Sequence, residues 1–148
     1  MAIVRKLLNE KSHDNLFTVA ATDTVLQALK VMSENNTGAV LVAEGDKIIG
    51  IFTERDYARQ GEVKGRVAGD TLISEVMTKE MVLVTPETTV RQCGELMGKY
   101  HVRHLPVLEK EHVIGIISLR RLAEALLEEQ KDTITELENY IMGTGYGR

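Results

Sequence analysis

The stretch KIIGIFTERDY, Lys47 to Tyr57, lies over HVIGIISLRRL, His112 to Leu122, when the chain is aligned with itself at an offset of 65 residues. The alignment runs without a gap from Leu16 to Tyr57 on Met81 to Leu122, and 11 of its 42 positions are identical. Most of the shared residues are apolar or glycine, as expected at packing positions. A unit of this length cannot bury its apolar faces alone, so we expect two copies to close on each other about a pseudo-twofold axis.

The hydrophobic periodicity within each copy changes from strand to helix and back. For the first copy it predicts a strand at 18–20, a helix capped by Thr22 or Asp23 that runs to Met32, strands at 39–42 and 47–52, and a helix capped by Thr53 that stops at Gly61. For the second copy it predicts an extended segment at 81–84, a helix from Thr88 or Thr89 to Tyr100, strands at 105–108 and 112–117, and a helix opened by Ser118. The predicted fold class is therefore α/β (α+β), with two β-α-β-β-α repeats.

The segments outside the copies are predicted to be a linker and two helical extensions. Residues 62–70 are rich in charge and glycine and are expected to be exposed, with a short helix at 72–77 leading into the second copy. An amphipathic N-terminal helix is marked by Ile3, Leu7 and Leu8. In the C-terminal helix, Ile134, Leu137 and Ile141 share one face that would cover a core edge or a partner subunit, and the tail GTGYGR is expected to fray. The expected units are 1–73, 74–130 and 131–148.

The composition is that of a globular protein, since 43% of the 148 residues are hydrophobic and 27% are charged. The net charge of −4 and the aromatic content of 4% argue against a nucleic-acid partner. No apolar run approaches the roughly 20 residues of a membrane-spanning helix, and the N-terminus has no secretory signal pattern, so we expect a cytoplasmic protein. The single cysteine, Cys93, is expected in the core and cannot form an intramolecular disulfide.

The sequence contains no recognised motif for catalysis or for metal binding. No nucleophile stands with a base and an orienting acid in a known pattern such as GxSxG or HExxH, so we do not expect an enzyme. The histidines His101, His104 and His112 have no acid or cysteine at ligand spacing, so no metal site is expected.

Four motifs carry a resemblance to a known family: GIFTERD at 50–56, VTPETTV at 84–90, RHLPVL at 103–108 and GIISLRR at 115–121. Together they resemble a tandem pair of cystathionine-beta-synthase (CBS) domains, the Bateman module, and ERDYAR with the C-terminal helix is similar to its stand-alone bacterial type. The resemblance covers residues 16–127. It implies a non-enzymatic regulatory or sensor module that binds an adenine nucleotide in the cleft between the copies: AMP, ADP or ATP, and in some members NAD or S-adenosylmethionine.

The resemblance also implies roles for individual residues. Asp56 would accept the ribose hydroxyl protons, and Thr53, at the start of a helix, would meet phosphate. The basic residues that match from the other copy are Arg103, His104 and Arg120. Adenine would lie against Val19, Ala20, Ala39 and Val40. A homodimer is implied as well, with helices at 57–60 and 122–127 as candidate interfaces, together with an unidentified regulated protein.

The second copy departs from this pattern, because Arg121 stands where the first copy has Asp56. An arginine cannot accept hydroxyl protons, so we expect one strong site per chain, although Ser118 stands in the place of Thr53. The departure leaves a scaffold or interaction module with a vestigial cleft as the alternative function. A second alternative, nucleic-acid binding through the arginines of the second copy, is opposed by the net charge. On structural grounds alone, Asp56 would be a partner of the helix dipole.

Overall fold

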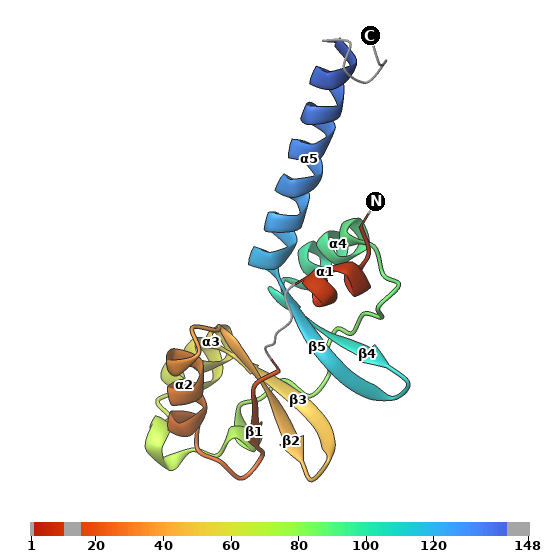
Figure 1. Cartoon of the computed structure of the whole chain (residues 1–148). Coiled ribbons are helices and arrows are strands. Elements are labelled where there is room, and N and C mark those ends of the chain that lie inside the picture. The colour runs from red at the N-terminus through yellow and green to blue at the C-terminus, as the bar shows by residue number, and fades with distance from the viewer. Residues whose placement is uncertain (1, 11–15, 142–148) are drawn as a thin grey trace.

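The computed structural model describes residues 2–10 and 16–141, which form two α/β halves and a long C-terminal helix (Figure 1). The strands are β1 (Thr18–Ala20), β2 (Ala39–Glu44), β3 (Lys47–Thr53), β4 (His104–Glu109) and β5 (His112–Ser118). The helices are α1 (Val4–Glu10), α2 (Val25–Glu34), α3 (Glu54–Asp56), α4 (Val90–Tyr100) and α5 (Leu119–Ile141). The predicted mixed α/β class is confirmed.

The first half is a three-stranded sheet in the order β1-β2-β3, with β1 parallel and β3 antiparallel to β2. Helix α2 buries Val25, Ala28 and Met32 against it. The prediction that Thr22 or Asp23 caps this helix was wrong, because the cap is Thr24, whose hydroxyl accepts the N–H of Gln27 at 3.1 Å. Asp23 closes the preceding turn instead, since its carboxylate accepts the N–H of Ala20 at 2.9 Å.

Helix α3 continues into a π-helix at Tyr57–Glu62, so the predicted stop at Gly61 was wrong. Gly61 is buried, and a Cβ atom there would lie 3.3 Å from the Cδ1 atom of Tyr57. The glycine therefore serves close packing against a ring one turn earlier. The linker that follows is mostly exposed, as predicted, and contains short 3-10 turns at Ala68–Asp70 and Ile73–Glu75.

The second half repeats the plan with a two-stranded sheet, β4-β5. Of the two residues predicted to cap α4, Thr88 and Thr89, the cap is Thr89, whose hydroxyl accepts the N–H of Gln92 at 3.0 Å. The extended segment predicted at 81–84 forms only one bridge, from Val84 to Val107. In the first half the N–H of Leu41 donates to the carbonyl of Phe17, just before β1. The residue equivalent to Leu41 is Pro106, which has no N–H, so the strand is not extended there.

The N-terminal segment completes the second half rather than the first. The N–H of Val90 donates to the carbonyl of Ala2 at 3.0 Å, and the N–H of Val4 donates to the carbonyl of Thr88 at 2.8 Å. Val4 and Leu7 belong to the core of the second half, and α1 lies beside α4 (Figure 1). The predicted N-terminal helix is confirmed. It was grouped with the first copy in the expected unit 1–73, but it packs on the second half instead.

The linker completes the first half in the same way. The N–H of Val25 donates to the carbonyl of Thr71 at 2.8 Å, and the N–H of Ile73 donates to the carbonyl of Asp23 at 2.9 Å. Ile73 and Val76 are buried in the core of the first half. Each half therefore borrows the segment that precedes the other half in the chain.

The C-terminal extension is one continuous helix, because α5 runs without a break through residue 131, where a boundary was expected. Its first turns bury Leu122 and Ala125, and its second half stands away from the body of the molecule (Figure 1). The tail that was expected to fray lies outside the described residues. Among the described helices, none has both the length and the apolar character needed to span a bilayer. Cys93 is buried, as predicted, and burial raises the pKa of its thiol to about 11.

Candidate ligand site between the two halves

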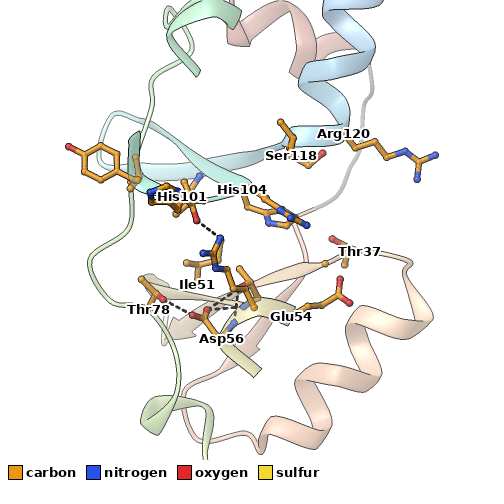
Figure 2. Close-up of a pocket in the computed structure, with 18 of the residues that line it drawn as sticks. Thr37, Ile51, Glu54, Asp56, Thr78, His101, His104, Ser118 and Arg120 are labelled. Carbon is orange, nitrogen blue, oxygen red and sulfur yellow. Dashed lines mark hydrogen bonds between the residues drawn. The ribbon is translucent and has the colours of Figure 1, made fainter. Parts of the chain in front are cut away.

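A cavity of about 1230 Å³ lies between the halves, and both contribute side chains to it (Figure 2). The first half supplies residues of the α2–β2 loop, the end of β3 and α3. The second half supplies the end of α4, the start of β4 and the start of α5. A volume of this size exceeds the roughly 300–1,000 Å³ typical of small-molecule sites, so the cavity can hold a ligand with several groups.

Asp56 is held in one orientation on the first wall. One carboxylate oxygen accepts the N–H and the hydroxyl of Thr53 at 3.0 and 3.2 Å, and the other accepts the Thr78 hydroxyl at 3.0 Å (Figure 2). The Thr53 hydroxyl accepts the N–H of Asp56, which completes a capping box at the start of α3 and confirms Thr53 as the predicted cap. Since a carboxylate offers about four acceptor positions, one remains for a ligand hydroxyl.

The environment of Asp56 shifts its proton affinity in two directions. Burial raises the pKa of the carboxyl above its ordinary value, while the hydrogen bonds from Thr53 and Thr78 act to lower it. Burial is the larger effect, because the carboxylate has lost part of its contact with water. A ligand hydroxyl that donates to this partly desolvated carboxylate would make a strong, charge-assisted hydrogen bond.

The opposite wall carries the basic residues predicted from the second copy. Arg103 and Arg120 are exposed at the cavity, and Ser118 opens α5 by accepting the N–H of Arg121 at 3.1 Å, as predicted for this cap. In Figure 2, Ser118 and His104 lie across the cavity from Asp56 and Glu54. The first wall carries both acids and arginines, at Glu54, Asp56, Arg55 and Arg59, whereas the charged residues of the second wall are Arg103 and Arg120.

His104 does not carry the charge that its place among the bases suggests. Burial, together with the nearby positive charge of Arg103, lowers the pKa of this imidazole to about 4. At pH 7 the ring is neutral, so the positive charge of this wall comes from the arginines. The ring packs against Gly38, where a Cβ atom would lie 3.4 Å from the Cε1 atom of His104 and 2.7 Å from a carboxylate oxygen of Glu54.

A hydrogen bond crosses the cavity from one half to the other. The Arg55 guanidinium donates to the carbonyl of His101 at 2.7 Å (Figure 2). His101 ends α4 in the left-handed conformation, with φ of 54°, which turns the chain toward the cavity. Arg55 therefore couples the start of α3 to the end of α4.

Six of the ten predicted ligand residues line this cavity: Thr53, Asp56, Arg103, His104, Ser118 and Arg120. The four residues expected to surround adenine do not line it. Val19, Ala39 and Val40 are buried in the cores, because β2 is the central strand and both of its faces are covered, and Ala20 is exposed on β1. The apolar part of the lining is Ile51, Val82, Val102, Pro106, Leu119 and Ala123. The ligand roles of all ten residues stay predictions.

Among the polar lining residues that sequence reasoning missed, Arg55 and Thr78 make hydrogen bonds that shape the site. Arg55 could have been found from the repeat, because it is identical to Arg120 at the equivalent position. Thr78 lies outside the aligned copies, and only its bridge to Ile51 brings it to Asp56. No local pattern in the sequence marks that contact.

The equivalent place in the second half is occupied by a cation. The Arg121 side chain is 11% exposed, and its Nη1 atom lies 4.0 Å from a carboxylate oxygen of Glu128. Two halves with the same backbone plan thus present opposite charges at equivalent positions. Among the described residues, no group of three or more His, Cys, Asp or Glu side chains gathers as a metal site would require.

Comparison with known proteins agrees with this architecture. A family model for the CBS domain matches residues 4–61 and 73–128. The CBS domain-containing protein CBSX3, mitochondrial, of Arabidopsis thaliana is 37% identical over 142 residues, which are 92% of this chain and 68% of that protein. The structure of a putative signal-transduction protein with CBS domains from Burkholderia ambifaria MC40-6 superposes with a TM-score of 0.84 at 38% identity, covering 87% of this chain and 96% of that chain.

A third solved structure of this fold contains ligands. It is the CBS domain pair of protein MJ0100 in complex with 5-methylthioadenosine and S-adenosyl-L-methionine, with a TM-score of 0.74, 20% identity, and coverage of 87% of this chain and 98% of that chain. At this identity the similarity concerns the fold.

Proposed function

Because the chain belongs to the CBS-domain family, with two CBS domains in tandem, we propose that it is a non-enzymatic sensor that binds an adenine nucleotide between its halves. The observation that carries the proposal is the cavity itself. One wall presents the oriented Asp56 carboxylate, and the other presents Arg103 and Arg120. A sugar phosphate needs this combination, an acceptor for hydroxyl protons and cations for the phosphate.

Each part of the nucleotide has a counterpart in the cavity. One ribose hydroxyl would donate to the acceptor position that remains on Asp56, and the phosphates would lie toward the arginines of the second half and the N–H groups at the start of α3. The base would lie against the apolar lining near Ile51 and Pro106. AMP, ADP and ATP share these groups, and NAD and S-adenosylmethionine share the ribose.

Protonation of His104 should accompany binding of a phosphate. The imidazole is neutral at pH 7 because its pKa is about 4, and a phosphate in its vicinity would raise that pKa. Proton uptake on binding would then make the affinity for a phosphorylated ligand increase as the pH falls toward about 4, the pKa of the free ring.

Sensing requires that the ligand prefer one arrangement of the halves over another. The bond from Arg55 to the carbonyl of His101 is the contact across the cavity that an anion would compete for, since it uses a guanidinium at the cavity wall. A ligand that draws Arg55 away from His101 would change how the halves are coupled, and a partner protein could detect that change.

The alternative function, a scaffold with an unused cleft, is favoured by one observation. In the second half the acceptor is replaced by Arg121, so that half does not offer a ribose anchor of its own. The scaffold and the sensor differ in a simple prediction, because only the sensor is stabilised by a nucleotide.

Calorimetric titration and thermal melts with AMP, ATP, NAD and S-adenosylmethionine test the proposal. A ligand at 100 times its dissociation constant should add about 2.7 kcal/mol to the free energy of unfolding. The variant Asp56→Asn should weaken binding by about tenfold or more, because it removes the charge that strengthens the hydrogen bond.

Asp46→Asn is the matched control, since Asp46 is an exposed residue of the turn between β2 and β3. This control should bind as the wild type does. If none of the four compounds shifts the melting temperature, the scaffold is correct. If Asp56→Asn binds like the control, the ribose assignment is wrong.

A further inference from the structure

The second half of α5 carries an exposed apolar stripe, which we define as Leu127, Gln130, Ile134, Leu137 and Ile141. The four aliphatic side chains are 66%, 56%, 56% and 76% exposed, in chain order. Most of the segment 130–141 of α5 extends beyond both halves (Figure 1). A row of large aliphatic residues on an extended helix is unfavourable in water and is a common mark of an interaction surface.

The spacing of the stripe is that of a coiled-coil seam. Its residues follow one another at intervals of three, four, three and four, so they occupy alternating a and d positions of two heptads. The face that α5 turns toward its own half is different, since it carries Leu122 and Ala125. The stripe is therefore placed to pair with another helix while the start of α5 stays packed.

The charges beside the stripe select the partner. The segment from Leu122 to Ile141 contains six acidic residues and one basic residue, Lys131. Lys131 and Glu138 both occupy e positions, seven residues apart. In an antiparallel pair of helices the e positions face one another, whereas in a parallel pair each e position faces a g position.

We propose that the stripe pairs with the same stripe of a second copy of this chain, with the two α5 helices antiparallel. Ile134 of each copy then packs against Leu137 of the other. Lys131 of each copy lies beside Glu138 of the other, and symmetry forms this ion pair twice. The one basic residue of the segment is thereby used in the contact.

Other arrangements of the same helices are less favourable. Shifting the antiparallel register by one heptad places Lys131 against Lys131 of the second copy, and Glu138 against Glu124, so like charges face one another. That shift also moves Gln130 next to the centre of the seam, whereas in the proposed register its amide lies at the ends, where it reaches water. A parallel pair places Glu138 beside Thr133 and forms no ion pair.

A short contact is sufficient for pairing because α5 is already folded in the single chain. In the proposed register the two helices overlap over residues 130–141, which are 12 residues or about 18 Å of helix, and Leu127 lies beyond the overlap. Two helices of this length free in solution would be marginal. Here the helix is already ordered by the packing of its first turns, so association does not have to order the backbone. This surface is independent of the ligand cavity, and it stands whether or not a nucleotide binds there.

Sedimentation of the full-length chain across a concentration series tests the pairing. We expect the wild type to associate and Leu137→Glu to weaken that association by about tenfold or more, because it introduces a charge into the seam. Thr135→Glu is the matched control, since it adds the same charge to an exposed position of the same helix away from the stripe. Circular dichroism confirms that each variant is folded.

Charge reversal tests the direction and the register. Lys131→Glu and Glu138→Lys should each weaken association by about threefold to tenfold, and the double variant should restore it, because the two ion pairs re-form with reversed signs. A wild-type chain that stays monomeric up to about 100 µM would overturn the proposal. So would association that Leu137→Glu leaves unchanged, or a double variant that is weaker than both single variants.

Discussion

The two halves of this molecule share a backbone plan but differ in the chemistry of equivalent positions. Both place a capping threonine or serine after the second hairpin strand, at Thr53 and Ser118, and both borrow a segment from elsewhere in the chain. Three positions away from each cap, however, the first half has an acid and the second half has Arg121. The comparison shows how a duplicated fold can form one asymmetric site, because one copy contributes the acceptor and the other contributes cations.

Variants in the borrowed segments should destabilise one half at a time, and of the variants considered they should lower the free energy of unfolding the most. Leu7→Ala removes a buried side chain from the second half, and Ile73→Ala removes one from the first, so each should lower the free energy of unfolding by about 3 kcal/mol. Hydrogen exchange should show faster opening of β4 and β5 in Leu7→Ala, and of β1 to β3 in Ile73→Ala. Faster exchange in the half that is nearest in sequence would contradict the crossed packing.

His104 should make the stability of the chain depend on pH through the second half alone, because its equivalent in the first half is Ala39, which does not titrate. The pKa of His104 is about 4 in the folded chain and 6.5 as an ordinary value, so the unfolded chain takes up the proton first as the pH falls. Stability from the neutral ring is present above about pH 6.5 and is lost toward pH 4.

Between pH 7 and pH 5 this residue should therefore cost the wild type about 2 kcal/mol of unfolding free energy, and His104→Ala should remove that loss. Denaturant titrations of both proteins at the two pH values measure the difference. The contribution of Asp56 is common to both proteins and cancels. Equal pH dependence in wild type and variant would show that the ring is not held neutral.

Equivalent glycines should respond unequally, and this is the smallest of the expected effects. A Cβ atom on Gly50 would lie 2.8 Å from the carbonyl oxygen of Thr78, whereas one on Gly115 would lie 2.8 Å from the flexible end of Leu8. Backbone cannot move aside as a side chain can, so Gly50→Ala should destabilise by about 1–2 kcal/mol and Gly115→Ala by less than about 0.5 kcal/mol. Thermal melts of the two variants measure this difference. If Gly115→Ala were the more destabilising variant, the backbone at the bridge between Ile51 and Thr78 would have moved to make room for the added Cβ atom.

Much of the fold could be predicted from the sequence because its signals are local. The caps at Thr53, Thr89 and Ser118 each depend on a hydrogen bond to a residue three positions further along the chain. The same local reasoning placed the cap of α2 wrongly, since three polar residues, Thr22, Asp23 and Thr24, stand in a row and only the turn geometry selects Thr24.

The candidate site was predicted in part, for a related reason. Asp56 and Arg120 could be named because the motifs that contain them, GIFTERD and GIISLRR, resemble those of CBS domains. Thr78 could not, because its contact with Asp56 spans 22 residues and depends on how the linker packs. The neutral state of His104 also escaped prediction, since it follows from burial that only the folded chain creates.

The amino-acid sequence by itself determined the duplication, the order of strands and helices, and the exchange of Asp56 for Arg121, because identity, hydrophobic period and capping are properties of neighbouring residues. The tertiary structure alone decided that α1 packs on the second half, that Val40 is enclosed in a core, and that Arg55 reaches His101 across the cavity. Those outcomes depend on which surfaces meet when the halves close, and contacts between residues far apart in the chain leave no period or motif behind them.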